Sequence, residues 1–550
     1  MKDVMTNDII LEVKHLSVAF KHEKVFKNAV QDVSFKVYKG QTLGLVGESG
    51  SGKSVSSLAI MGLLDKKISK ITGGEISFYG KSKAMIFQEP MTALNPVKKC
   101  GSQVDEMILL HNKITKKEAK HKTLNLFEEV LLPDIHRAYN SYPFELSGGQ
   151  RQRVMIAMAI SCKPELLIAD EPTTALDVTI QNTILDLLKN LQQKHNMGML
   201  FISHDLGVVH SISDTISVIY QGKIVEQGSS EDIFLRPRNV YTKSLIASSP
   251  PLDTKPKRLL TVKDFMSGNI PKIDNITQEE IKKHNDLIYS AEPILQVKDL
   301  DIDYVLKRNL FGRIKRKFHA VDKVCFDVYK GETLGLVGES GCGKSTVGKA
   351  ITRLIDISSG NICFESKNLS NLTKTEKHNL RKDIQIIFQD PYSSLNPRMQ
   401  IGKAIEEPME VYKLYDSKLR KDKTLELLSR VGLTHDYYDR YPHELSGGQR
   451  QRVGIARALS LMPKLIICDE SVSALDVSVQ AQVLNLLNEL KEDFNFTYMF
   501  ISHDLSVVKY MSDRIIVMQS GKIVEEGFAA DIYTNAQQDY TKKLINAIRR

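Results

Sequence analysis

The chain has 550 residues, of which 42% are hydrophobic and 26% charged, and its formal net charge is +9 at neutral pH. This length exceeds that of one ordinary domain, and the composition is that of a globular protein. No run of 18 or more apolar residues is present, so we expect no membrane span, and no apolar signal core follows Met1, so we expect no export. The six cysteines lack C-x-x-C spacing, which argues against a zinc site or a disulfide framework and fits a reducing compartment.

The positive charge has two interpretations, and the sequence leaves both open. It indicates either an acidic partner, such as nucleic acid or lipid headgroups, or an ordinary lysine-rich surface. The basic residues are densest between positions 307 and 317, a segment that either touches a membrane surface or partner or is a solvated loop. They are Lys307, Arg308, Arg313, Lys315, Arg316 and Lys317, with Phe311 and Phe318 interleaved.

One phosphate-binding pattern occurs twice. Residues 47–54 read GESGSGKS and residues 338–345 read GESGCGKS, and both match G-x-x-x-x-G-K-[ST]. Each copy follows the same apolar, strand-like run, TLGLV, and the second copy begins 291 residues after the first. Two copies behind matching strands predict two nucleotide-binding domains in tandem.

The repeat extends well beyond these loops. Matching segments include FQEP and FQDP at Phe87 and Phe388, and ISHD at Ile202 and Ile501. Short β-branched runs alternate with amphipathic helical stretches in each copy, which predicts an α/β fold with a largely parallel sheet. We expect a first domain over residues 8–249, a proline-interrupted linker over 250–292 with one short helix near 277–288, and a second domain over 293–550.

The phosphate loops have the residues that their chemistry requires. Glycines let the backbone approach a phosphate, and the following helix presents its first N–H groups to the anion. The lysine adds a positive charge for the β- and γ-phosphates, and the last serine offers a hydroxyl to Mg²⁺. The predicted residues are Gly47, Gly50, Gly52, Lys53 and Ser54 in the first copy, and Gly338, Gly341, Gly343, Lys344 and Ser345 in the second.

Two acids end an apolar strand in each copy. The pairs are Asp170–Glu171 after LLIA and Asp469–Glu470 after LIIC. Carboxylates at the tip of a buried parallel strand face the site crevice. The first acid suits Mg²⁺, directly or through water, and the second can polarise the attacking water as a general base.

A further glycine-rich segment, LSGGQRQR, occurs at residues 146–153 and again at 445–452. This motif resembles the signature of the ATP-binding cassette (ABC) ATPases. The resemblance to this family covers nearly all of both halves of the chain. The resemblance implies that each signature segment faces the γ-phosphate held by the other domain in a head-to-tail arrangement within the chain. Lys53 and Glu171 would then share a composite site with Ser446 and Gly448, and Lys344 and Glu470 with Ser147 and Gly149. The implied ATP-contacting signature residues are Ser147, Gly148, Gly149, Gln150, Ser446, Gly447, Gly448 and Gln449.

The other elements of the family can be placed residue by residue. Gln88 and Gln389 resemble the Q-loop glutamine, which reaches Mg²⁺ and water and senses the membrane subunit. Asp177 and Asp476 resemble the D-loop aspartate that crosses the domain interface, and His204 and His503 the switch histidine at the γ-phosphate. Phe20 and Tyr304 stand where the adenine-stacking aromatic is expected, with Phe26 and Phe318 as alternatives.

The resemblance also implies the fold and the ligands. Each domain would contain a mostly parallel core sheet, an antiparallel β subdomain and a helical signature subdomain, and would bind ATP with Mg²⁺. The chain departs from the family at Ser471, where the first copy has the usual proline, Pro172. Both halves keep their lysine, glutamate and histidine, so we expect two hydrolytic sites. The implied metal ligands are Ser54, Gln88, Asp170, Ser345, Gln389 and Asp469.

Three classes of ABC protein lack membrane spans: transporter motors with separate membrane subunits, twin-cassette proteins acting on the ribosome, and DNA-repair or chromosome ATPases. The third class would need long coiled coils or zinc modules, which the sequence does not show. The segments EPMTALNP and DPYSSLNP and the repeated YTK motif at Tyr241 and Tyr540 resemble the peptide/nickel importer group. We therefore expect the ATPase motor of a peptide importer, and the ribosomal translation factor is the alternative.

The importer interpretation implies partners and a location. We expect two multi-span permease subunits that contact the surface around Gln88 and Gln389, and a solute-binding protein that acts indirectly. It implies no nucleic-acid partner. The chain would lie peripherally on the cytoplasmic face of the inner membrane.

Overall fold

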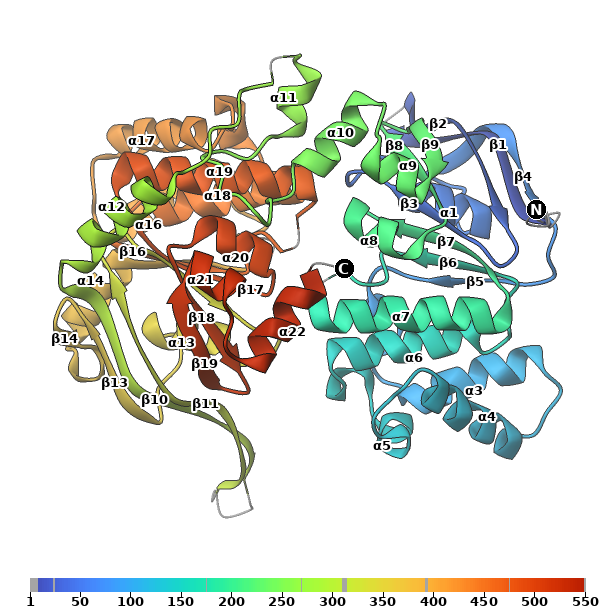
Figure 1. Cartoon of the computed structure of the whole chain (residues 1–550), viewed down its shortest axis with the longest axis horizontal. Coiled ribbons are helices and arrows are strands. Elements are labelled where there is room, and N and C mark those ends of the chain that lie inside the picture. Colours follow the sequence, from blue (N-terminus) through green and yellow to red (C-terminus); the bar gives the residue numbers. More distant parts are fainter. Residues whose placement is uncertain are drawn as a thin grey trace.

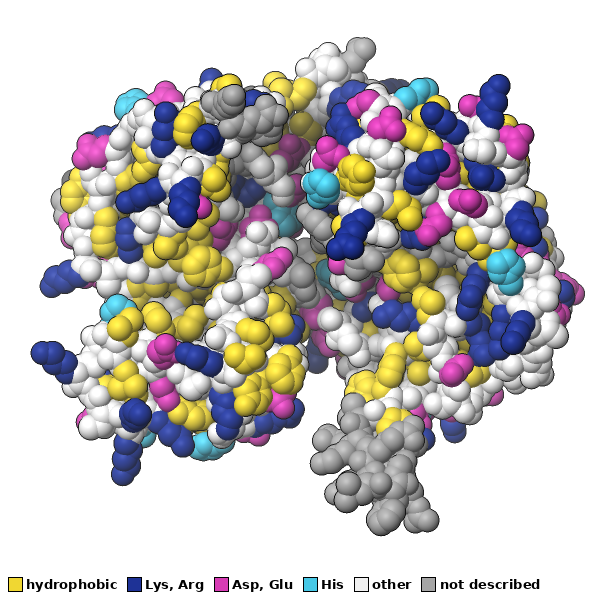
Figure 2. Space-filling view, turned by 180° about the vertical axis from the view of Figure 1, so that it is seen from behind, with side chains coloured by type: hydrophobic (Ala, Val, Ile, Leu, Met, Phe, Trp, Pro, Cys, Tyr) yellow, Lys and Arg dark blue, Asp and Glu magenta, His cyan; other side chains and the backbone are white. Residues whose placement is uncertain are grey.

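The computed structural model describes residues 8–22, 25–174, 176–268, 270–308, 314–390, 394–473 and 475–548. Two repeats, from β1 to α10 and from β10 to α22, lie side by side, and the segment that carries α11 and α12 connects them (Figure 1). Of the predicted basic segment, residues 309–313, with Phe311 and Arg313, lie outside the described residues. On the face seen in Figure 2, Lys and Arg side chains are scattered over both repeats among acidic ones.

Each repeat is built on a six-stranded, mostly parallel sheet with one antiparallel edge strand. The strand orders are β5-β6-β7-β3-β8-β9 and β15-β16-β17-β12-β18-β19, so the same topology occurs twice. The bounds in the first repeat are β3 Thr42–Val46, β5 Lys83–Ile86, β6 Leu166–Asp170, β7 Gly198–Ser203, β8 Thr215–Tyr220 and β9 Lys223–Ser229. Those in the second are β12 Thr333–Val337, β15 Ile384–Ile387, β16 Leu465–Asp469, β17 Thr497–Ser502, β18 Arg514–Gln519 and β19 Lys522–Phe528.

A smaller antiparallel sheet packs against each central sheet. Its strand order is β2-β1-β4 in the first repeat and β11-β10-β13-β14 in the second. The bounds are β1 Ile9–His22, β2 Val25–Tyr38, β4 Ser69–Phe78, β10 Pro293–Arg308, β11 Ile314–Tyr329, β13 Ser359–Phe364 and β14 Lys367–Asn368.

Most helices cover the other face of each central sheet and form a helical subdomain around α6 and α18, whereas α1, α13 and α14 pack with the antiparallel sheet of their repeat. Those of the first repeat are α1 Lys53–Met61, α2 Pro90–Ala93, α3 Cys100–His111, α4 Lys116–Glu129, α5 Ile135–Asn140, α6 Gly148–Ile160, α7 Val178–His195, α8 Leu206–Ile212, α9 Ser230–Leu235 and α10 Val240–Ala247. Those of the second are α13 Lys344–Ile351, α14 Lys374–Asp383, α16 Ile401–Val411, α17 Ser417–Arg430, α18 Gly447–Leu459, α19 Val477–Phe494, α20 Leu505–Met511, α21 Ala529–Thr534 and α22 Asp539–Ile548.

The central strands separate two hydrophobic cores in each repeat. Along β6, Leu166 and Ile168 pack with the antiparallel sheet, whereas Leu167 and Ala169 pack with the helical subdomain. Successive strand residues point to opposite faces, so a fully apolar run is required where both faces are covered. This explains the continuous apolar sequences before the phosphate loops and before the acid pairs, and it fixes both motifs at the same edge of the sheet.

The connecting segment packs onto both repeats. It contains the expected helix, α12 (Gln278–Tyr289), and a second short helix that the sequence reading did not predict, α11 (Val262–Met266). Leu259 belongs to the core of the second repeat, and its backbone exchanges two 2.8 Å hydrogen bonds with the Asn485 side chain. Val262, three residues later, belongs to the core of the first repeat. The segment therefore bridges the two repeats.

A buried carboxylate anchors this segment to the second repeat. Asp513 accepts hydrogen bonds from the Thr333 backbone N–H (2.8 Å) and from Lys491 (3.0 Å), and His284 of α12 lies 3.6 Å away. Burial would raise the pKa of Asp513, but the charges of Lys491 and Lys255 and the contact with His284 outweigh burial and hold the pKa well below its usual range. Two residues of the connecting segment thus contribute to one charge cluster of the second repeat.

The first repeat provides a matched control for this cluster. Asp214 accepts the equivalent bond from Thr42 (2.8 Å), but Gln192 stands where the second repeat has Lys491. We expect Asp513→Asn to lower the free energy of unfolding by about 3 kcal/mol, because it leaves buried ammonium groups without a counter-charge. Asp214→Asn is expected to cost about 1 kcal/mol. Urea unfolding of the full chain measures both, and equal losses would contradict the asymmetry.

Candidate nucleotide sites

Each phosphate loop (P-loop) connects a central strand to the first helix of its repeat. Gly52 and Gly343, just before α1 and α13, have φ values of 103° and 107°, which residues other than glycine rarely adopt. A Cβ on Gly47 would lie 2.2 Å from the Ile219 carbonyl oxygen. The P-loop backbone therefore lies so close to β8 that position 47 has no room for a side chain.

The P-loop lysines are buried and fixed. Lys53 is 4% exposed, and its ammonium donates hydrogen bonds to the carbonyls of Gly47 (2.6 Å) and Glu48 (2.9 Å). Lys344 makes the same bonds at 2.7 and 2.8 Å. Burial lowers the pKa of Lys53, against the opposing effect of the Glu171 carboxylate, whose Oε1 lies 4.0 Å from Nζ.

A serine and an aspartate lie together beside each loop. Ser54 Oγ donates to Asp170 at 3.1 Å, and Ser345 Oγ donates to Asp469 at 2.6 Å. Burial raises the pKa of Asp170 to about 6 and also raises that of Asp469. A hydroxyl beside a carboxylate that is desolvated as an anion suits a small hard cation, so this donor set fits Mg²⁺.

The glutamate after β6 is the centre of a polar cluster. Gln88 Nε2 donates to its Oε2 at 2.9 Å, Thr174 Oγ1 donates at 3.0 Å, and His204 Nδ1 lies 3.3 Å from the same oxygen. Burial would raise the pKa of Glu171, but its contact with His204 and the charges of His204 and Lys53 prevail and lower the pKa to about 2. The carboxylate is therefore ionised and held by the side chains of Gln88, Thr174 and His204.

The second site repeats this arrangement with different contacts. Gln389 Nε2 donates to Glu470 at 2.6 Å, and His503 Nδ1 lies 3.6 Å from the same oxygen. Burial would raise the pKa of Glu470, but His503 and Lys344 lower it. Ser473 bonds the Glu470 backbone carbonyl (2.9 Å), whereas Thr174 bonds the Glu171 carboxylate.

The sites also differ at single positions around the same framework. Ser471, the departure from proline, is buried beside Glu470, and Cys342 replaces Ser51 in the P-loop. The Lys344 ammonium donates to the Cys342 sulfur at 3.7 Å.

Residues of each repeat reach the P-loop of the other. Asp476, before α19, accepts hydrogen bonds from the Ser49 backbone N–H (3.0 Å) and hydroxyl (2.9 Å). Asp177, which caps α7, accepts one from the Ser340 backbone N–H at 3.3 Å. The Ser478 hydroxyl, on α19, donates to the Glu48 carboxylate. The two repeats therefore face each other head to tail.

The signature segments begin α6 and α18 and lie beside these crossing helices. Ser147 and Ser446 cap their own helices in capping boxes with Gln150 and Gln449. Gly149 packs against Ile180 of α7, and Gly448 packs against Val479 of α19, where an added Cβ would lie 2.8 and 2.3 Å from the neighbouring side chain. Among the described residues, polar contacts to the opposite P-loop come from the two aspartates and Ser478, and none from the signature serines.

The aromatic candidates lie on the antiparallel sheets. Phe20 is half-buried against the core of the first repeat, and the more exposed Phe26 has the Lys70 ammonium 4.2 Å from its ring centroid. Tyr304 and Phe318 face each other across β10 and β11, and both are exposed. All four candidates thus lie on strands of the antiparallel sheets, and the choice among them stays a prediction.

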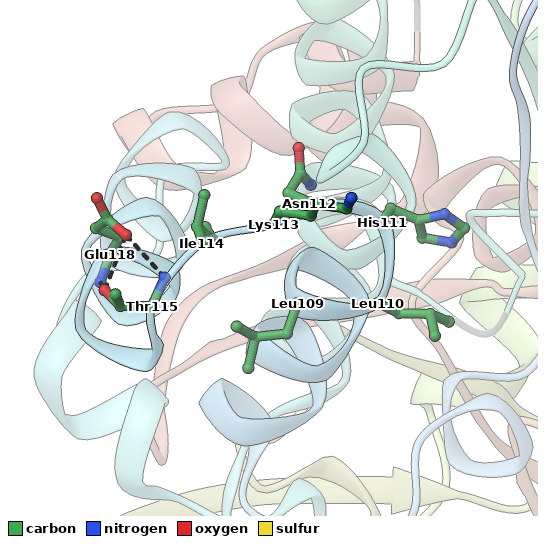
Figure 3. Close-up of a pocket in the computed structure, with 8 residues that line it drawn as sticks. All are labelled: Leu109, Leu110, His111, Asn112, Lys113, Ile114, Thr115 and Glu118. Carbon is green, nitrogen blue, oxygen red and sulfur yellow. Dashed lines mark hydrogen bonds between the residues drawn. The ribbon is translucent and has the colours of Figure 1, made fainter.

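Two cavities of the described residues have different surroundings. One, of about 570 Å³, lies at the connection between α3 and α4 (Figure 3) and is lined by none of the predicted site residues. The other, of about 420 Å³, lies in the second repeat beside Gln389, and its lining includes Phe388, Glu407, Tyr412 and Arg457. Most of the lining of this second cavity comes from β15, α16 and α18.

Two contacts at the P-loops were missed by sequence reasoning. The hydroxyls of Tyr241 and Tyr540 accept hydrogen bonds from the backbone N–H groups of Glu48 and Glu339. The available signal was the repeated YTK motif, which served only as a family resemblance. The P-loop amide that each tyrosine bonds could not be predicted from the sequence, because it lies about 200 residues away in the chain.

Two P-loops, two acid pairs and reciprocal aspartate contacts define a twin-cassette nucleotide-binding protein. Comparison with known proteins identifies its family. The ABC transporter family model matches residues 30–174 and 321–473, and the model for the oligopeptide/dipeptide transporter C-terminal region matches residues 225–274. The chain belongs to the ABC transporter ATP-binding proteins, in the oligopeptide/dipeptide importer group with two fused cassettes, and is an ATPase.

Similar proteins extend over the whole chain. The glutathione import ATP-binding protein GsiA of Pectobacterium atrosepticum is 45% identical over 98% of this chain and 89% of its own length. GsiA of Escherichia coli K12 has the same identity and coverage. A solved dimeric structure of the ATP-binding cassette MJ0796 with ADP and Pi is 28% identical over 43% of this chain and 98% of its own, with a TM-score of 0.39. None of the described helices is both long and apolar enough to cross a membrane.

The aspartate contacts predict which of two substitutions reduces ATP hydrolysis more. Asp476→Ala removes two hydrogen bonds to Ser49, and we expect ATP hydrolysis to fall at least about tenfold, since bonds to a charged group are the stronger kind. Asp177→Ala removes one longer bond to the opposite P-loop, besides the N-cap bond from Ile180 within its own repeat, and should reduce the rate less. Steady-state assays with the exposed control Asp356→Ala test this order. Equal rates in Asp476→Ala and the control would refute it.

Proposed function

We propose that the chain is the ATP-hydrolysing motor of an importer for peptide-like solutes, acting on separate membrane permease subunits. The observation that carries this proposal is the head-to-tail contact of the two P-loops with the opposite aspartates, in a chain 45% identical to importer ATPases over 98% of its length. ATP bound at either P-loop would lie between the two cassettes, so binding draws them together and hydrolysis releases them.

The site residues have the following proposed roles. Lys53 and Lys344 neutralise the β- and γ-phosphates, and the signature segments supply N–H groups from the opposite cassette. Glu171 and Glu470 orient and polarise the attacking water as ionised carboxylates, and His204 and His503 contact the γ-phosphate. Catalysis is thus mainly positioning and charge stabilisation.

Ser54 with Asp170, and Ser345 with Asp469, would hold Mg²⁺, and Gln88 and Gln389 would be further ligands. Mg²⁺ supplies charge neutralisation of the phosphate oxygens. Both glutamines also bond the glutamates, at 2.9 and 2.6 Å. Gln88 and Gln389 would therefore connect each proposed Mg²⁺ site to the glutamate that is its proposed general base.

The cavity beside Gln389 supports the proposed permease contact. Its lining includes Phe388, the residue before Gln389, which bonds Glu470, so a helix of a membrane subunit seated there would contact the chain directly beside this glutamine. We place the corresponding contact in the first cassette around Gln88, and the protein at the cytoplasmic face of the inner membrane. A solute-binding protein would deliver the solute without touching this chain.

The solute class rests on the relatives. The oligopeptide/dipeptide model match and the glutathione import relatives favour a small peptide or peptide-like compound. Reconstitution with the two permeases and the binding protein of the same system tests it, with glutathione and di- and tripeptides as probes. ATP-dependent uptake of one of these supports the proposal. Co-sedimentation with ribosomes and no permease binding would instead support the translation-factor alternative.

Both sites are predicted to hydrolyse ATP. Glu171→Gln and Glu470→Gln should each reduce steady-state hydrolysis at least about a hundredfold, because each removes a base that contributes on the order of 10² or more. The exposed substitution Glu231→Gln is the control. If one of the two glutamine variants hydrolysed ATP at the wild-type rate, the two-site account would be wrong.

A further inference from the structure

A tyrosine hydroxyl meets each P-loop at the same place. Tyr241 accepts a hydrogen bond from the Glu48 backbone N–H at 3.1 Å, and Tyr540 accepts one from the Glu339 backbone N–H at 3.0 Å. Each tyrosine is the second residue of the last helix of its repeat, α10 or α22. Two copies of one contact, 299 residues apart, indicate a shared role.

Both tyrosines are held firmly. Tyr241 is 1% exposed, and its ring centroid lies 4.2 Å from that of Tyr220, whereas Tyr540 packs against the core of the second repeat. Burial raises the pKa of both hydroxyls, so they remain neutral. A fixed, neutral hydroxyl can set the direction of the amide that it bonds.

The same stretch of each P-loop faces the opposite cassette. The Glu48 carboxylate accepts a bond from Ser478, and Ser49 bonds Asp476 through its N–H and its hydroxyl. In the second P-loop, Ser340 follows Glu339 and donates to Asp177. The second and third P-loop residues are therefore held between the last helix of their own repeat and the other repeat.

The chain beyond each tyrosine reaches the opposite long helix. The Asn182 side chain of α7 donates to the Ala547 carbonyl of α22 at 2.8 Å. In the first repeat, the chain after α10 brings Leu259 onto Asn485 of α19. Each last helix, with the chain that follows it, thus contacts a P-loop and the opposite repeat together.

We propose that Tyr241 and Tyr540 are positioning residues for ATP, which fix the first amides of each P-loop and link phosphate binding to the contact between the cassettes. This inference rests on the proposed role of the P-loops. Glu48 and Glu339 directly precede the amides that would surround the phosphates. Holding that first peptide in place aligns the amides that follow, so less ordering is needed when ATP binds.

Tyr241→Phe and Tyr540→Phe test the inference, because they remove the hydroxyl and keep the ring. Each should raise the KM for ATP about three- to tenfold, the effect of one neutral hydrogen bond, and change kcat less. The nucleotide-free melting temperature should fall by no more than about 2–4 °C, the cost of one buried hydrogen bond. Tyr220→Phe is the matched control, since its ring stacks on Tyr241 and its hydroxyl bonds only the neighbouring Gln221 side chain among the described residues.

The outcomes separate the two proposals. An unchanged KM in both variants would overturn the inference, as would a lower melting temperature with an unchanged KM, which indicates a purely structural hydroxyl. If the wild-type chain bound no ATP at either P-loop, the proposed function itself would fail. An equally raised KM in the control, Tyr220→Phe, would also overturn the inference, because the rise would then not result from loss of the P-loop hydrogen bond.

Discussion

The hydrogen bonds between each P-loop and the aspartate of the opposite cassette are the constraint on which the arrangement depends. Asp476 takes two bonds from Ser49, and Asp177 takes one from Ser340. Each aspartate also precedes the long helix that packs on its own signature helix. Each P-loop is therefore connected through one aspartate to a long helix of the other cassette, and we infer joint action of the two proposed sites from this connection.

The two halves share a framework but not every contact. Thr174 bonds the Glu171 carboxylate, whereas Ser473 bonds the backbone of Glu470. The connecting segment adds a second asymmetry, because Lys255 and His284 join the charge cluster of Asp513, and no such cluster surrounds Asp214 in the described part of the chain. Fusion in one chain thus gives the second cassette an anchored extension that the first lacks.

Local motifs explain what the sequence could predict. The P-loops, the acid pairs, the parallel sheet and the helix near residues 277–288 each depend on neighbouring residues, and the structure shows the P-loop lysines, Glu171 and Glu470 in closed polar clusters. Asp177 and Asp476, which the family pattern marked as interface residues, hydrogen-bond the P-loop of the opposite repeat.

The remainder depends on tertiary packing that no local pattern encodes. The bond from Glu48 to Tyr241 joins residues 193 positions apart, and Leu259 meets Asn485 across 226 positions. The short helix α11 was missed for the same reason, since it is stabilised by packing of Val262 into the first core rather than by its own five residues.

We propose that one chain closes around two ATP molecules. The most direct test is the number of nucleotides retained by the double variant Glu171→Gln and Glu470→Gln after rapid gel filtration with MgATP. Two ATP molecules per chain is the predicted result. Retention of one or none, by a protein that remains folded, would contradict the account.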